Sequence, residues 1–358
     1  MSTRRSALGT TGDVLEDIKG SANLRSFGAA FLSQFFPTDD VASAFRMERL
    51  FGYSKTEGEP ELRTVVAELT GVAARNVIIT DGAAQALFLI ILAGLSADDT
   101  VLVPRPTFPA YLRIASYRGC SFEFYDWRAD GSDLIDRLGS SKGPSPSAVI
   151  INSPHNPTGI VLDDAVYDEV LRLAAAKRCL VIFDDAYAWL ERPANQITHV
   201  NRKLWTAHPA GTLVGIVSLG KLLCLPGMRL GFIVADDQEL LEKIVEAKRH
   251  LTHSSCPASE TLAASLLLSA EWAEAKGRLL NAITGRRHEF NRIATQLGAR
   301  PVTGARGLYA YASTAAAIAN AGVEGVPGSV FESSNREARY CLAAADSDWT
   351  RFAALSRY

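Results

Sequence analysis

The sequence predicts an α/β fold in which a mostly parallel sheet is flanked by helices and a smaller α/β domain follows. Seven short apolar segments alternate with stretches of helical periodicity, a pattern typical of a parallel sheet covered on both faces. The chemically unusual residues follow these segments, at the strand ends where such sheets bind ligands. The 358 residues, 47% of them hydrophobic, allow one large core and a second small domain. The apolar segments are residues 76–80, 100–103, 121–125, 148–152, 179–184, 213–218 and 231–235.

The pattern divides the chain into three parts. Residues 1–40 form an N-terminal arm, because no sustained helical or strand period runs through them. We expect the arm to pack on the small domain or on another subunit, through an apolar patch that consists of Phe27, Phe31, Phe35 and Phe36. Residues 41–245 form the large domain and residues 246–358 the small C-terminal one. Helical periodicity at 239–249 and 260–297 and a strand-like segment at 307–311 follow the last strand of the large domain.

Composition favours a small-molecule ligand. The chain has 37 basic and 39 acidic residues, a net charge of −2, and no basic run that would suggest nucleic acid or an anionic membrane. No stretch of about 18 apolar residues and no signal-peptide pattern occurs, so we expect a soluble, cytoplasmic protein. Five cysteines lie far apart without the spacing of metal ligands, and we expect them to be reduced. His250, His253 and Cys256 share one segment, but no second cluster completes a metal site.

One lysine stands out in the segment after residue 217. Lys221 follows a buried-type strand and interrupts an otherwise uncharged run. Burial lowers the pKa of an ammonium group, and a neutral amine is the nucleophile that forms Schiff bases with carbonyl compounds. The alternative is a lysine whose stem packs on apolar surface while its charge reaches solvent. The segment by itself leaves both open.

The residues around Lys221 resemble a known motif. Ser218-Leu219-Gly220-Lys221, followed by Pro226-Gly227-Met228-Arg229-Leu230-Gly231, is similar to the lysine motif of class I/II aminotransferases, which are fold-type-I enzymes that use pyridoxal 5′-phosphate. The resemblance implies that Lys221 holds the cofactor covalently, and that Ser218 and Arg229 bind its phosphate. Gly220 stands where the family often has serine. The resemblance extends from about Tyr53 to the C-terminus.

A second phosphate-binding element follows the first apolar segment. Gly82, Ala83 and Ala84 lie between a strand and a helix, so their free amides and the helix dipole would favour a dianion. A glycine at a strand-to-helix turn is also common without any ligand. The turn resembles the family's Gly-Ala/Ser-x-Gln/Glu sequence, which implies that the amides of Ala83 and Ala84 bind the phosphate.

Three further segments resemble motifs that hold the cofactor ring. Phe108 stands where the family stacks an aromatic side chain on the pyridine, although it could be an ordinary core residue. Asp184 ends an apolar strand and is the first acid of a sequence similar to the family's Asp-Glu-x-Tyr; a carboxylate there would keep the pyridine nitrogen protonated. Helix capping is its alternative role. The same motif implies Tyr187, and the sequence Asn152 to Gly159 implies Asn156, as partners of the phenolic oxygen.

Two residues complete the expected site. Tyr53 resembles a tyrosine that reaches the phosphate of the neighbouring subunit, which implies a homodimer with shared active sites; the alternative is an aromatic side chain packed under a loop. Arg339 matches the arginine that binds the substrate carboxylate, a role that its planar fork suits. A solvated surface arginine is the alternative, and Arg336 competes for the role.

The resemblance implies an aminotransferase that moves an amino group between an amino acid and a 2-keto acid, with the freed Lys221 as general base. The runner-up is decarboxylation, elimination, cyclisation or oxidation of an amino acid in the biosynthesis of an unusual one. A ligand-binding relative without catalysis is a third reading, which the presence of Lys221 disfavours. Residues 1–40 lack the family's usual substrate-contacting pattern.

Overall fold

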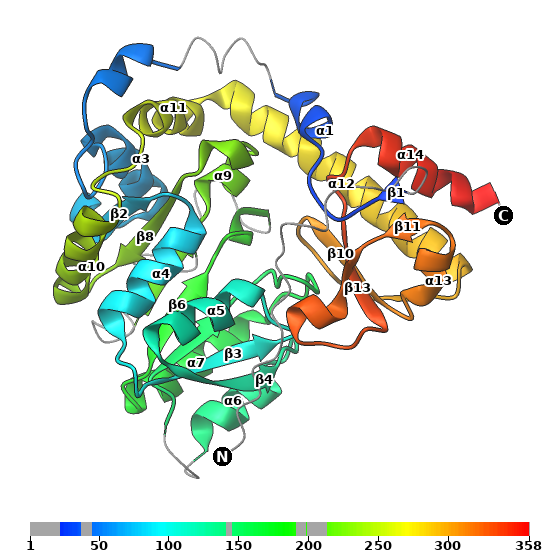
Figure 1. Ribbon diagram of the computed structural model, residues 1–358, viewed down its shortest axis with the longest axis horizontal. Helices are drawn as coiled ribbons and strands as arrows, with labels where there is room; N and C mark the ends of the chain where they lie inside the picture. The colour runs from blue at the N-terminus through cyan, green and yellow to red at the C-terminus, as the bar shows by residue number, and fades with distance from the viewer. Residues whose placement is uncertain (1–21, 37–44, 141–144, 191–197, 199–212, 358) are drawn as a thin grey trace.

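The computed structural model describes residues 22–36, 45–140, 145–190, 198 and 213–357. A central seven-stranded sheet forms the larger layer (Figure 1), with strand order β2-β8-β7-β6-β5-β3-β4. β8 runs in the opposite direction to the other six strands of this sheet. All seven predicted strands are confirmed in this sheet, with bounds β2 Val77–Thr80, β3 Thr100–Arg105, β4 Ser121–Asp126, β5 Ala148–Ile151, β6 Leu180–Asp184, β7 Leu213–Val217 and β8 Gly231–Ala235.

Helices bury both faces of this sheet. Adjacent strand residues point into two separate cores, so that Ile78 belongs to one and Ile79 to the other. One core is closed by α4 (Ala83–Gly94), α5 (Pro109–Arg118) and α10 (Gln238–Leu251). The other is closed by α3 (Pro60–Thr70), α6 (Ser132–Gly139), α7 (Asp164–Ala176) and α11 (Pro257–Leu268). Burial on both sides explains why inner strands such as β5, β7 and β8 are continuous apolar runs.

A second sheet forms the C-terminal part of the molecule. It is antiparallel, with order β12-β13-β10-β9. The long helix α12 (Ala270–Gln296) runs from the side of α11 to this sheet (Figure 1). The other elements of this C-terminal part are β9 Arg300–Pro301, β10 Tyr309–Ser313, α13 Ala316–Asn320, β12 Val326–Pro327, β13 Glu337–Cys341 and α14 Asp346–Ala354.

The described part of the N-terminal arm packs on this C-terminal part of the same chain. β1 (Ala22–Asn23) pairs in parallel with β11 (Val323–Glu324), and α1 (Ala29–Ser33) follows. A Cβ at Gly28 would lie 2.4 Å from the backbone nitrogen of Ala345, so only glycine permits this approach. The arm is therefore fixed to the C-terminal part from residue 22 to residue 36, while residues 1–21 and 37–40 of the predicted arm lie outside the described residues.

Two helical expectations differ in detail from the structure. The pattern at 260–297 is two helices, because Ser269 ends α11 and caps α12 by accepting a hydrogen bond from the backbone of Trp272 at 3.1 Å. Residue 245, where the sequence suggests a domain boundary, lies inside α10, and α10 packs against α4 on the large sheet. The division of the chain at that residue stays a prediction.

Short helices connect the main elements. They are η1 Met47–Phe51, η2 Ala74–Asn76, η3 Ala188–Leu190, α9 Leu219–Leu222, η4 Pro226–Met228, η5 Gly328–Phe331 and η6 Leu355–Arg357. Among the helices that the structure describes, none has the length and apolar character needed to cross a membrane. In the same parts of the chain, no group of three or more histidine, cysteine or acidic side chains is placed to hold a metal ion.

Candidate active site

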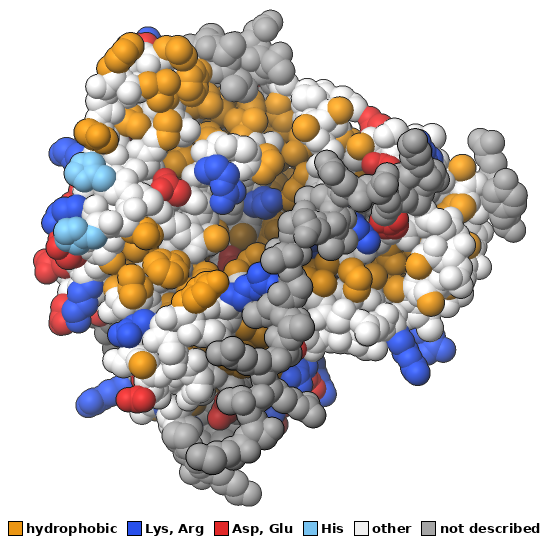
Figure 2. Space-filling view, viewed as in Figure 1, with side chains coloured by type: hydrophobic (Ala, Val, Ile, Leu, Met, Phe, Trp, Pro, Cys, Tyr) orange, Lys and Arg blue, Asp and Glu red, His pale blue; other side chains and the backbone are white. Residues whose placement is uncertain are grey.

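Most of the predicted site residues converge at one edge of the large sheet. β2, β3, β5, β6 and β7 run in the same direction, so the loops after them meet at that edge. They enclose a cavity of about 170 Å³, near the hollow at the centre of the face in Figure 2. Nine of the twelve predicted residues line it, namely Ala83, Ala84, Phe108, Asn156, Asp184, Tyr187, Ser218, Lys221 and Arg229.

Lys221 lies in α9, directly after β7, inside this cavity. Burial lowers the pKa of its ammonium to about 8, and the charges of Arg339 and Arg229 act in the same direction. Its Nζ lies 3.8 Å from the ring centroid of Phe27, which the arm places over it. A much larger fraction of Lys221 is therefore neutral at physiological pH than of an exposed lysine, as a nucleophilic amine requires.

The start of α4 forms a cradle for an anion. Gly82 has φ +89°, and no acidic residue occupies the first turn of this twelve-residue helix. A Cβ at Gly82 would lie 2.9 Å from Nη2 of Arg229, so the glycine lets the guanidinium approach the free amides. Gly231 is also required, since its Cβ would lie 2.9 Å from the backbone nitrogen of Ala83. Amides, a helix N-terminus and an arginine together fit a phosphate dianion.

Asp184 ends β6 and also lines the cavity. Its carboxylate accepts hydrogen bonds from the hydroxyl of Tyr111 at 2.6 Å and from the backbone of Ala186 at 3.2 Å. Burial raises the pKa of Asp184 to about 6, an effect that these two hydrogen bonds partly offset. The group is therefore an anion at neutral pH, held in a place where a protonated nitrogen would stabilise it.

Tyr111 is a site residue that the sequence reasoning missed. It is 1% exposed and lies three residues after Phe108, with the two rings edge to face at 5.6 Å between centroids. The signal was present in the segment Pro106 to Tyr111, because residues three apart at a helix start share one side. Without the position of β6, however, nothing in that segment connects Tyr111 to Asp184.

Arg339, on β13 of the C-terminal sheet, contacts a residue that lines the cavity. Its Nη1 donates to Oδ1 of Asn156 at 2.9 Å, and its guanidinium lies 4.1 Å from the ring centroid of Tyr309. Among the residues that the structure describes, Nε of Arg339 is buried and has no hydrogen-bond partner, which leaves donor capacity for a carboxylate. Arg336, the competing arginine, is exposed.

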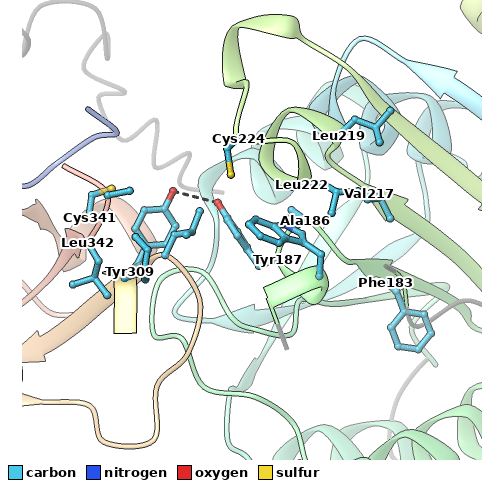
Figure 3. Close-up of a cluster of buried hydrophobic side chains, with 14 of the residues drawn as sticks. Phe183, Ala186, Tyr187, Val217, Leu219, Leu222, Cys224, Tyr309, Cys341 and Leu342 are labelled. Carbon is cyan, nitrogen blue, oxygen red and sulfur yellow. Dashed lines mark hydrogen bonds between the residues drawn. The ribbon is translucent and has the colours of Figure 1, made fainter. Parts of the chain in front are cut away.

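Tyr187 and Tyr53 differ in where the structure places them. The hydroxyl of Tyr187 lies 3.2 Å from that of Tyr309, and both side chains are buried beside Cys224 and Cys341 (Figure 3). Tyr53 is 85% exposed, and its ring meets the edge of His253 with centroids 5.1 Å apart. Its own chain does not bring Tyr53 to the cavity.

The donor set fits a pyridoxal phosphate group. It combines an amine of lowered pKa, a buried carboxylate, a dianion cradle and an aromatic wall around one cavity. The family model described as "Aminotransferase class I and II" matches residues 27–354. The chain belongs to this family. Class I and II aminotransferases depend on pyridoxal 5′-phosphate, so the family and cofactor that the motifs implied are confirmed.

The individual relatives have low sequence identity to this chain and match only part of it. An aspartate aminotransferase of Sulfurisphaera tokodaii is 24% identical over 69% of this chain and 63% of its own length. A histidinol-phosphate aminotransferase of Chlorobium phaeobacteroides is 27% identical over 64% of this chain and 59% of its own. Capreomycidine synthase of Streptomyces vinaceus is 28% identical over 66% of this chain and 58% of its own. The chain thus covers less than two thirds of each of these relatives.

Solved structures support the fold. The aspartate aminotransferases of Thermus thermophilus and Thermotoga maritima each superpose with a TM-score of 0.78 at 20% identity. Each comparison covers 94% of this chain and 91% of the other. The predicted fold class, fold type I with a large mostly parallel sheet, is therefore confirmed. The roles of the individual site residues stay predictions.

Proposed function

We propose that the protein is a pyridoxal-phosphate-dependent aminotransferase that transfers an amino group between an amino acid and a 2-keto acid. The observation that carries this proposal is the position of Lys221. Its amine, with a pKa lowered to about 8, shares a cavity with the Asp184 carboxylate and the cradle at the start of α4. Such a site can hold the phosphate, the ring and the aldehyde of one cofactor at the same time.

Each part of the cofactor has its own partners in this proposal. Arg229, Ser218 and the amides of Ala83 and Ala84, in the turn that Gly82 permits, hold the phosphate. Phe108 covers the ring, and Asp184 keeps a proton on the ring nitrogen. Asn156 and Tyr187 donate hydrogen bonds to the phenolic oxygen. Tyr111 holds the Asp184 carboxylate in place through its 2.6 Å hydrogen bond.

The chain's residues then divide the reaction between them. When bound, the cofactor supplies an electrophilic carbon for the amino group and an electron-withdrawing ring that stabilises negative charge at the substrate's α-carbon. Arg339 binds the carboxylate and so fixes the orientation of the α-carbon. Lys221 would act as the base that takes the α-proton and could return it to the carbon on the other side of the amino nitrogen. A pKa of about 8 suits this task at neutral pH. Phe27, against Nζ of Lys221, helps to exclude water.

A second candidate function uses the same site. The similarity to capreomycidine synthase favours another reaction of a bound amino acid, such as cyclisation, elimination, decarboxylation or oxidation, in the biosynthesis of an unusual amino acid. The arm with Phe27, which departs from the family's usual substrate-contacting pattern, is compatible with this alternative.

We also propose that the protein acts in the cytoplasm as a homodimer. In the segment around η1, Met47 is 66%, Phe51 94% and Tyr53 85% exposed. Large apolar side chains exposed together favour burial against a second copy. In that dimer Tyr53 of each copy would contribute to its neighbour's phosphate site. The arm 1–40, the large domain 41–245 and the small domain 246–358 remain our proposed division of the chain.

Single-turnover spectroscopy tests the function. The holoprotein is mixed with one amino acid at a time, without a keto acid. Transamination leaves the cofactor in its aminated form and releases one equivalent of keto acid, whereas the alternative reactions release other products and leave the cofactor unchanged. If Lys221→Ala keeps the wild-type absorption and turnover, the assignment of Lys221 is wrong. Light scattering measures whether the active species is a dimer.

A further inference from the structure

We propose that Tyr309 is a positioning residue of this active site. Its hydroxyl donates a hydrogen bond to Tyr187 and thereby strengthens the hydrogen bond from Tyr187 to the cofactor's phenolic oxygen. The inference rests on the proposed function. Tyr309 belongs to β10 of the C-terminal sheet, whereas Tyr187 follows β6 of the large sheet. The interaction therefore joins the two halves of the molecule at the cavity.

The ring of Tyr309 is held firmly. The guanidinium of Arg339 lies 4.1 Å from its centroid, and the ring of Phe27 packs at 6.0 Å with an interplanar angle of 52°. The backbone carbonyl of Tyr309 accepts a hydrogen bond from Arg287 at 2.7 Å. At 7% exposure the side chain has little freedom to turn. Its hydroxyl is thus fixed in space by contacts that do not involve Tyr187.

The two hydroxyls lie 3.2 Å apart (Figure 3). Burial raises the pKa of both Tyr187 and Tyr309 above the ordinary value, so both are protonated at neutral pH and each can donate. Among the described residues, Tyr309 is the one hydrogen-bond partner of the Tyr187 hydroxyl. The rings meet edge to face, with centroids 5.7 Å apart and an interplanar angle of 79°.

The direction of this hydrogen bond follows from proton counting. A tyrosine hydroxyl carries one proton and two acceptor positions. If Tyr187 gives its proton to the phenolic oxygen, the bond between the tyrosines must be donated by Tyr309. A hydroxyl that accepts one hydrogen bond becomes a better donor in the next, so Tyr309 strengthens the bond from Tyr187.

The same ring supports Arg339. Tyr309 therefore contacts the proposed carboxylate-binding residue through its face and the proposed partner of the phenolic oxygen through its hydroxyl. A purely structural side chain would need the ring but not the hydroxyl. A test of the proposal should therefore remove the hydroxyl of Tyr309 and keep its ring.

The test is the pH dependence of the bound cofactor's absorption band in Tyr309→Phe. In this variant the hydrogen bond from Tyr187 to the phenolic oxygen is weaker, which leaves that oxygen more basic. The bound cofactor then holds its proton more tightly, and the pH midpoint of its spectral transition should rise by about half a unit. Tyr187→Phe should raise the midpoint further. The double variant should match Tyr187→Phe, because Tyr309 acts through Tyr187.

Tyr311→Phe is the matched control. Tyr311 lies two residues along the same strand, is 3% exposed and donates to Glu337 at 3.2 Å. Its variant loses a buried hydroxyl of the same sheet and should keep the wild-type midpoint. Thermal melts of all variants check that they fold.

The outcomes are separable. An unchanged midpoint in Tyr309→Phe, or a further shift when it is added to Tyr187→Phe, would overturn the role of Tyr309 while leaving the proposed function intact. A wild-type protein that shows no cofactor band at all would overturn the proposed function, and the present inference with it.

Discussion

Replacing Lys221 with methionine should stabilise the cofactor-free protein while abolishing its chemistry. The side chain of Lys221 is largely buried, and folding lowers the pKa of its ammonium from 10.5 to about 8. Methionine keeps a stem of similar length against Phe27 but carries no charge. The substitution therefore removes an unfavourable buried charge without opening a large cavity.

The magnitude follows from the pKa shift. The difference between 10.5 and about 8 is about 2.5 units, which at about 1.36 kcal/mol per unit corresponds to about 3 kcal/mol at pH 7. The ammonium also gains about 1 kcal/mol from the Phe27 ring, which the variant loses. We expect a net increase of about 2 kcal/mol in the free energy of unfolding of the cofactor-free protein.

The pH dependence gives the sharper result. Because the folded pKa is lowered, the unfolded chain binds more protons than the folded one between about pH 8 and 10.5, and wild-type stability rises with pH over that window. Urea denaturation should therefore show the largest gap between Lys221→Met and wild type below about pH 8, and a shrinking gap above it. Lys243→Met, which removes an exposed lysine paired with Glu239 at 2.7 Å, is the control and should change stability little. A variant that is less stable than wild type at pH 7, or a gap that does not shrink, would refute the reasoning.

Three further predictions concern the rest of the site. Asp184→Asn should stabilise the cofactor-free protein by up to about 3 kcal/mol at pH 8. Folding raises the pKa of Asp184 from 3.8 to about 6, so wild-type stability falls as pH rises through that window. Cofactor titration should show weaker binding to the variant, and a variant less stable than wild type at pH 8 would contradict the prediction. Arg339→Lys should raise the KM for the amino acid about 10-fold or more, because a lysine cannot form the two-point contact. An unchanged KM would remove Arg339 from the substrate site. Gly231→Ala should cost about 1–3 kcal/mol in unfolding experiments and weaken cofactor binding, because its Cβ would lie 2.7–2.9 Å from three backbone atoms. Gly227→Ala, whose Cβ has open space, should do neither.

The strands of the large sheet could be predicted from the sequence because a buried strand appears there as a local run of apolar residues. β5 and β7, for example, are apolar along their whole length because both of their faces are covered, and their ends are marked by polar residues. No local pattern in the sequence indicated that β8 lies between β2 and β7. β2 pairs with β8, a strand more than 100 residues away in sequence, and periodicity within a segment does not encode such a pairing.

The same distinction holds within the site. Residues carried by a local motif, such as Asn156 or Arg229, reach the cavity as the sequence predicted. Tyr111 and Tyr309 were missed, although each hydrogen-bonds a predicted residue, because their partners lie 73 and 122 positions away in sequence. Phe27 was recognised as apolar, but its place over Lys221 depends on how the arm packs against β11 and residues 343–345.

Burial in this site disfavours the charged forms of both Lys221 and Asp184. Burial shifts both pKa values toward the neutral form, downward for the lysine and upward for the aspartate, and neither group contributes to the other's shift. When bound, the cofactor would provide an aldehyde carbon for the amine and a protonated nitrogen for the carboxylate. Because the two are independent, the stability gains of Lys221→Met and Asp184→Asn in the cofactor-free protein should add. If the double variant instead gains much less than the sum in denaturation experiments, the two charges already stabilise each other before the cofactor binds, and the site is not preorganised around the cofactor in the way proposed here.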